Sequence, residues 1–147
     1  MQKVVHFEIP ADDVERAKSF YGSVFDWELQ TVPMGESDYT TVKTTAVDEQ
    51  TQMPTEPGAI NGGMMQRDPG ISTAPVITIS VDGIDDALKQ IEDKGGSTVV
   101  ARTPIPGMGA FAYFKDSEGN VLGLWESTPY ILLRATSPRA SRQRSAE

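Results

Sequence analysis

Hydrophobic and polar residues alternate in the first segment of the chain. In the segment that follows, apolar residues recur at helical spacing. Residues 3–9 (KVVHFEI) alternate, which predicts a strand with His6 and Glu8 on one face and apolar side chains on the other. From Asp13 to Phe25 apolar residues recur every three or four positions, which predicts an amphipathic helix. Runs rich in β-branched and aromatic residues then predict strands over residues 27–32, 39–45 and 59–66.

The same pattern begins again after a stretch bounded by Pro and Gly at residues 67–75. An alternating run over residues 75–81 predicts a strand, and apolar residues at helical spacing predict a helix from Ile84 that ends at Gly95 and Gly96. Further strands are predicted over residues 97–103, 110–116 and 121–126.

The chain therefore holds an internal repeat of strand, helix and three strands. The first strands superpose at an offset of 72 residues and the helices at an offset of 70. We predict an α+β fold in which two βαβββ repeats, about residues 3–66 and 75–126, form a curved mixed sheet shaped as a cup, with the helices outside. Residues 1–127 are expected to form a single domain.

The net charge of the predicted domain (residues 1–127, called the body here) is opposite in sign to that of residues 128–147. Four arginines and one glutamate from Arg134 onward sum to +3, so the net charge of −8 leaves −11 on the body. The low-complexity, basic remainder is predicted to be partly disordered. An acidic body disfavours nucleic acid and favours cationic ligands, although it also serves solubility.

The composition suits a reducing compartment. There are no cysteines, which excludes disulfides, thiolate metal sites and a cysteine nucleophile. Neither a signal peptide nor the roughly 20 apolar residues of a membrane span is visible, so a cytoplasmic protein without a membrane partner is expected. Nucleotide-phosphate loops are absent, and a hydrolase triad is disfavoured because there is a single histidine.

Three segments resemble the vicinal oxygen chelate superfamily: VVHFEIPADDVERAKSFYGSVFDWEL, VDGIDDALKQIEDKGG and DSEGNVLGLWE. This group includes glyoxalase I, extradiol dioxygenases, fosfomycin-resistance enzymes and bleomycin-binding proteins. The glyoxalase/bleomycin-resistance-like branch is the most similar. The resemblance covers about residues 3–126 and implies the cup fold and a homodimer, but not one particular reaction.

The resemblance also implies where a divalent metal ion would bind in chelating members. His6 matches one of four ligand positions, whereas Thr78 and Gly123 stand at two others, and residues 59–66 offer no carboxylate or imidazole for the fourth. We therefore predict no metal and no other cofactor, because one imidazole binds such an ion weakly. Gly123 leaves a gap at the carboxylate position, or merely eases the curvature of its strand.

Strand alternation predicts which side chains face the cup. His6 is the candidate catalytic residue, with a satisfied structural histidine as the alternative. Glu8 is expected to raise its pKa. The candidate ligand-binding residues are Glu8, Tyr39, Thr78, Ser80, Tyr113, Gly123 and Trp125, with ordinary core packing as the alternative. Residues 104–111 form either a lid over the cup or a plain turn.

Function remains open between three classes at this point. The first is a metal-independent protein that binds a small organic molecule in the cup, including an antibiotic-sequestering resistance protein. The second is a lyase, isomerase or dioxygenase that uses His6 with or without a divalent metal. The third is a domain that interacts with another protein.

Overall fold

The computed structural model describes residues 1–128 of the 147-residue chain, so all of the predicted basic tail except Thr128 lies outside the described residues. The elements follow the predicted order of two βαβββ repeats. They are β1 (Val4–Ala11), α1 (Val14–Phe25), β2 (Glu28–Met34), β3 (Ser37–Lys43), β4 (Gly62–Gln66), β5 (Val76–Ser80), α2 (Ile84–Asp93), β6 (Ser97–Ile105), β7 (Gly109–Lys115) and β8 (Val121–Ser127).

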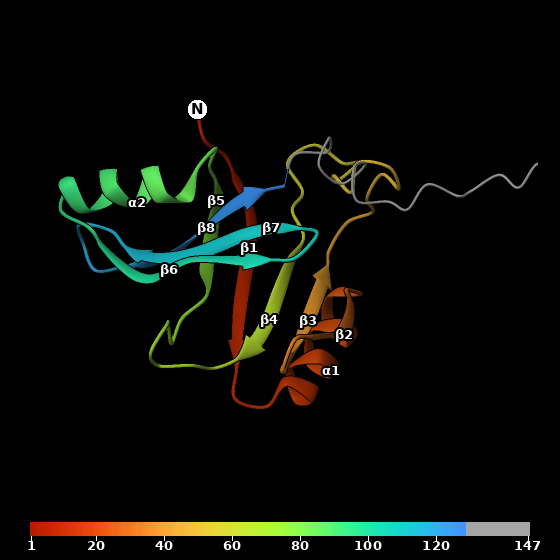
Figure 1. The fold of residues 1–147 in the computed structure, drawn as a ribbon. Coiled ribbons are helices and arrows are strands. Elements are labelled where there is room, and N and C mark those ends of the chain that lie inside the picture. The colour runs from red at the N-terminus through yellow and green to blue at the C-terminus, as the bar shows by residue number, and fades with distance from the viewer. Residues whose placement is uncertain (129–147) are drawn as a thin grey trace, which may run out of the picture.

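All eight strands belong to one mixed sheet in the order β2-β3-β4-β1-β5-β8-β7-β6. The two repeats meet where β1 pairs antiparallel with β5, and within each repeat the first strand pairs parallel with the last. The sheet curls so strongly that β6 and β7 cross the direction of β1 and β4 (Figure 1). This architecture confirms the predicted α+β cup with the helices outside.

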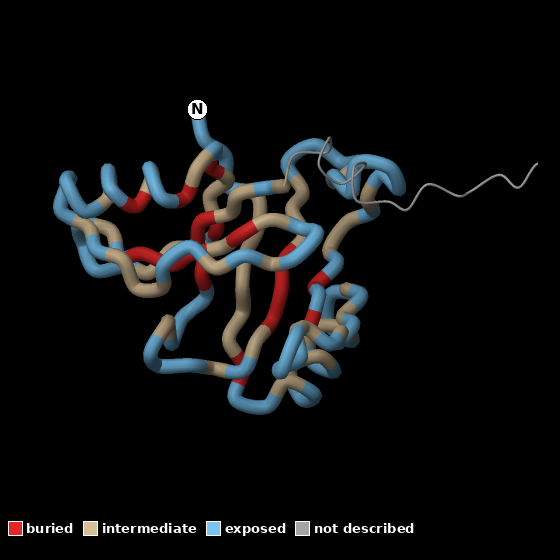
Figure 2. The backbone as a smooth tube through the Cα atoms, in the orientation of Figure 1, coloured by how far each residue is buried: buried red, intermediate tan, exposed pale blue. Residues whose placement is uncertain are grey.

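Each repeat has its own core between its helix and its part of the sheet. In the second repeat Ile84 and Leu88 of α2 pack with Ala112 and Leu124, and all four are buried. In the first repeat the buried cluster lies in the strands, and no residue of α1 is buried. The buried stretches accordingly follow the central strands and the inner side of α2 (Figure 2).

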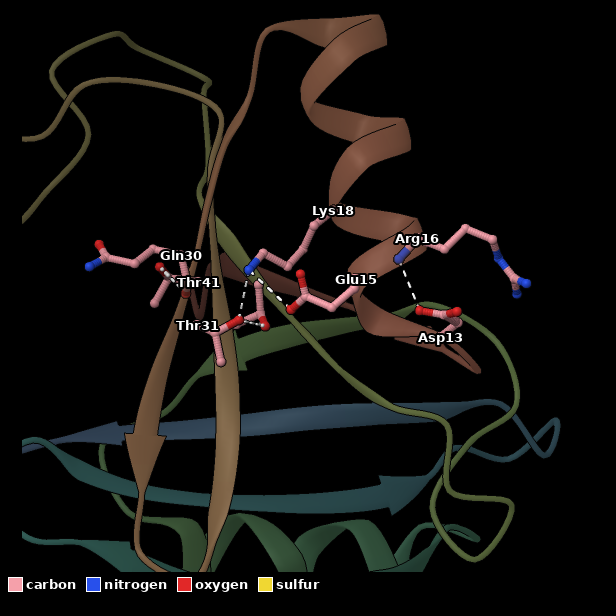
Figure 3. A network of polar contacts seen from close by, with 8 residues as sticks. Asp13, Glu15, Arg16, Lys18, Gln30, Thr31 and Thr41 are labelled. Atoms are coloured by element: carbon pink, nitrogen blue, oxygen red, sulfur yellow. Dashed lines mark hydrogen bonds and ion pairs between the residues drawn. The ribbon is translucent and has the colours of Figure 1, made fainter.

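Local sequence signals explain the ends of both helices. Asp13 caps α1 by accepting a hydrogen bond from the Arg16 backbone N–H at 3.0 Å (Figure 3). Behind α2, Gly95 has a φ of +100°, a conformation that glycine adopts without strain.

The segment 104–111, predicted as a lid or a plain turn, forms the connection between β6 and β7. Its first residues finish β6 and its last begin β7, and only residues 106–108 connect the two strands. Across residues 1–128, no helix has both the length and the apolar character needed to cross a membrane.

The unequal cores lead to a test by substitution at matching positions of the two repeats. Ile84→Ala, at a side chain with 0% exposure, should lower the free energy of unfolding by about 2–4 kcal/mol. Val14→Ala at the half-buried start of α1 should lower it by about 1 kcal/mol or less. Urea unfolding measures both, and equal losses would contradict the asymmetry of the two cores.

Candidate functional site

The cup face of the sheet, defined here by His6, Glu8, Thr78, Gly123 and Tyr113, lies opposite the face covered by the helices. In the β1–β5 pair His6 lies opposite Thr78, and along β8 Gly123 lies beside Thr78 and opposite Tyr113. Directly opposed residues point to the same side of a sheet, so the register brings these predicted site residues into one row.

Glu8 and Tyr113 form the strongest polar contact in this row. The Tyr113 hydroxyl donates to Glu8 Oε2 at 2.5 Å, joining the two repeats across the cup. The other carboxylate oxygen, Oε1, lies 3.8 Å from His6 Nε2, and the Glu8 side chain is 14% exposed. Among residues 1–128 no lysine or arginine forms an ion pair with Glu8, so its charge is not balanced by a fixed cation.

His6 makes a second contact across the cup, to Tyr39 of β3. Its Nε2 and the Tyr39 hydroxyl are 3.1 Å apart and share a hydrogen bond. A glycine permits this contact, because a Cβ added at Gly63 of β4 would overlap the Tyr39 hydroxyl. Gly63 was not among the predicted site residues. The available signal was the Gly62-Gly63 pair, a weak feature inside a predicted strand.

Thr78 fills the gap that was predicted beside Gly123. A Cβ on Gly123 would lie 2.6 Å from Thr78 Oγ1, and both residues are buried. Of the two interpretations of Gly123, the structure does not support the gap at the carboxylate position, because the neighbouring threonine already occupies the volume of a larger side chain.

The remaining predicted residues lie at one end of the cup face. Ser80 lies beside Trp125, and Trp125 lies opposite Phe111 in the β7–β8 pair. The Trp125 indole N–H donates to Ser127 Oγ at 2.9 Å. The rings of Phe111 and Tyr113 meet edge to face, with centroids 5.8 Å apart. An apolar aromatic wall thus borders the polar row, an arrangement suited to an organic ligand.

Burial sets the protonation of the polar row. Desolvation lowers the pKa of His6 to about 4, so the imidazole is neutral at physiological pH. The expectation that Glu8 raises this pKa was wrong: the pKa is lowered, and the cause is desolvation by burial. Desolvation also raises the pKa of Glu8, although the Tyr113 hydrogen bond opposes the shift. Burial, followed by the nearby Glu8 charge, raises the pKa of both Tyr39 and Tyr113, which remain protonated donors.

The donor set does not fit the divalent-metal site of chelating relatives. His6 Nε2 is engaged by Tyr39, one oxygen of Glu8 is engaged by Tyr113, and Thr78 offers only a hydroxyl. Within residues 1–128, no three His, Cys, Asp or Glu side chains come together as a group that could hold a metal ion. A carboxylate introduced at Gly123 would also collide with Thr78.

The packing of Thr78 against Gly123 is testable by paired substitution. Gly123→Ala should lower the free energy of unfolding by about 1–3 kcal/mol, because the new methyl group overlaps Thr78 Oγ1. Thr78→Ala in the same chain should recover part of this loss by removing that oxygen. Urea unfolding of the two single variants and the double variant measures the coupling. Additive effects would contradict the contact.

The protonation of His6 can be followed directly, since it is the single histidine of the chain. Its ring C–H proton resonance should titrate with a midpoint near the lowered pKa of about 4. Because the unfolded imidazole takes up its proton near pH 6.5, His6 should reduce stability as the pH falls from 6.5 towards 4. A midpoint at or above 6.5 by NMR would show that the ring is not desolvated.

Known proteins similar to this chain share its fold. A glyoxylase-like domain-containing protein from Didymella fabae is 32% identical over 120 residues, which cover 77% of this chain and 84% of that protein. The crystal structure of methylmalonyl-CoA epimerase from Mycobacterium tuberculosis has a TM-score of 0.59 at 14% identity, covering 88% of this chain and 90% of that one.

A variant of the Streptomyces coelicolor methylmalonyl-CoA epimerase, in complex with 2-nitronate-propionyl-CoA, has a TM-score of 0.61 at 14% identity and covers 88% of this chain and 99% of that one. These two structural likenesses show the fold alone. The family model of the Glyoxalase/Bleomycin resistance protein/Dioxygenase superfamily matches residues 3–124. The chain therefore belongs to the glyoxalase/bleomycin resistance protein/dioxygenase superfamily.

Proposed function

We propose that this protein binds a small organic molecule on the cup face without a metal ion. The observation that carries the proposal is the state of Glu8: Tyr113 donates to Oε2, and Oε1 lies 3.8 Å from the His6 imidazole, with no lysine or arginine in an ion pair with Glu8 among residues 1–128. A partly buried carboxylate without a paired cation is stabilised by a ligand that brings a hydrogen-bond donor or a positive charge.

The surroundings of Glu8 favour a cationic or amine-bearing aromatic ligand. Phe111 and Trp125 provide an apolar wall, while Glu8 and the two tyrosine hydroxyls provide polar anchors. The net charge of −8 further disfavours an anionic ligand. Coenzyme A esters carry several phosphate charges, so a ligand unlike that of the structurally similar epimerases is favoured. Sequestration of a cationic drug is consistent with this chemistry.

A thermal-shift comparison of aromatic amines with the matching carboxylic acids tests the ligand class. Amines should raise the melting temperature, because a molecule that binds only the folded state stabilises it, and acids should not. Glu8→Gln should abolish the shift and Tyr113→Phe should reduce it. Glu36→Gln, an exposed carboxylate in the β2–β3 turn, is the matched control and should leave it unchanged.

The metal-independence of binding requires a separate measurement. Protein purified without chelator should contain much less than one equivalent of Ni, Zn, Fe or Mn, and binding of the amine should survive dialysis against EDTA. Stoichiometric metal, or loss of binding after EDTA with recovery on adding one ion, would overturn the metal-free proposal. A stabilising shift with acids but not amines would overturn the proposed ligand class instead.

Proton transfer at Glu8 is the second candidate function. It is favoured by the desolvated carboxylate and by the neutral His6 ring 3.8 Å away, since both accept protons. Exchange of a bound ligand's C–H hydrogen with D₂O that is lost in Glu8→Gln would support it. Binding with no exchange would leave the protein a binding module.

A further inference from the structure

The loop that joins the two repeats lies over one end of the cup face. This crossover loop (residues 67–75) runs from β4 to β5, and β1 lies between these two strands in the sheet (Figure 1). The loop therefore has to pass across the end of β1, where Glu8 lies opposite Val76 and Pro10 lies beside Met65. A small recess is left between the strands and the loop. Its lining residues are Glu8, Pro10, Met65, Ile71, Ser72, Ala74 and Val76.

The size and the chemistry of this recess limit what it can hold. Its volume is about 10 Å³, which is room for one group of the size of a water molecule. Among the lining residues Glu8 is the only one that ionises, and apart from Ser72 the others have apolar side chains. The Ser72 hydroxyl donates to the Ala74 carbonyl at 2.9 Å, so it is already engaged within the loop. Glu8 is therefore the main partner for a group placed in the recess.

Arg67 fixes the crossover loop to the end of β1. Its guanidinium donates to Asp12 Oδ1 at 2.9 Å and to the Pro10 carbonyl at 3.5 Å. The same guanidinium donates to the backbone carbonyl of Thr73, inside the loop. One side chain thus ties both sides of the recess together, and these hydrogen bonds oppose widening of the space beside Glu8.

We propose that the recess binds the head group of the ligand and admits a primary ammonium group but not a quaternary one. The inference rests on the proposed function, because it requires that Glu8 binds a cation. A primary ammonium group is close to water in size and donates up to three hydrogen bonds. A trimethylammonium group is too large for a volume of about 10 Å³ and has no N–H to donate to Glu8. Ile71 is thus a specificity-determining residue, and Arg67 is a positioning residue.

The opposite end of the cup face indicates where the rest of the ligand lies. The aromatic wall contains Trp125, which lies beside Ser80 on β5. Ser80 is four residues from Val76 of the recess, a separation of about 13 Å at roughly 3.3 Å per residue. A ligand that reaches both ends therefore carries its aromatic ring and its amine on a connecting chain of several atoms, as an arylalkylamine does.

Isothermal titration calorimetry of the full chain with phenylbutylamine and with phenylbutyltrimethylammonium tests the recess. The primary amine should bind at least about tenfold more tightly, because the added methyl groups do not fit. Ile71→Ala enlarges the recess and should reduce this ratio to about threefold or less. Ile77→Ala removes the same atoms from the opposite face of β5, where Ile77 is 49% exposed, and should leave the ratio unchanged.

The positioning role of Arg67 has its own signature. Arg67→Gln releases the crossover loop and should also lower the ratio to about threefold, through tighter binding of the quaternary compound. A merely structural role would weaken both compounds alike and leave the ratio as it is, which would contradict the assignment of Arg67.

The outcomes separate this inference from the proposed function. Equal binding of the two compounds by the unaltered chain, lost in Glu8→Gln, would overturn the inference and leave the proposed function standing. An unchanged ratio in a folded Ile71→Ala variant would overturn it in the same way, and Ile71→Val is the milder variant should Ile71→Ala fail to fold. Binding of neither compound would contradict the proposed function and the inference together.

Discussion

Antiparallel pairing of β1 with β5 is the interaction on which the remaining structure depends. It joins two repeats whose sheets are otherwise four-stranded, and it places His6 directly opposite Thr78. Side chains alternate with a period of two, so a slip of one residue would turn His6 and Glu8 towards the helices and expose the apolar face. The hydrophobic face beneath the helices and the polar row in the cup are therefore maintained by the same register.

Bringing polar groups into the cup has a desolvation cost, and the structure limits that cost in two ways. Glu8 and His6 each have a tyrosine hydroxyl as partner, so the buried groups are hydrogen-bonded. The pKa shifts of the row favour the neutral forms of His6 and both tyrosines. What is left is a carboxylate oxygen that faces the cup beside an aromatic wall.

The two repeats show how one architecture accommodates different packing. In the second repeat Leu88 and Ile84 give α2 an apolar inner face, and the outer residues are polar. In the first repeat Val14, Ala17 and Tyr21 of α1 pack on the sheet only half-buried, and Phe20, Val24 and Phe25 are exposed. The position of each helix is set by the chain connections of the βαβββ unit. The fold therefore tolerates both ways of packing a helix on the sheet.

Much of this protein was determined by its sequence alone. Alternation over residues 3–9 and helical spacing from Asp13 to Phe25 predicted elements that the structure confirms, because backbone geometry translates hydrophobic period directly into secondary structure. The duplicated pattern predicted the cup, and strand parity predicted that His6, Thr78 and Gly123 share one face.

How those residues contact one another follows from the folded chain and not from local pattern. That Thr78 fills the space beside Gly123, and that Gly63 makes room for Tyr39 to reach His6, depends on side-chain positions in strands far apart in sequence. The pKa of His6 is lowered by the exclusion of water around the ring. The local sequence pattern predicts neither the space around a side chain nor its exposure to water. Both depend on segments that come into contact only in the folded chain.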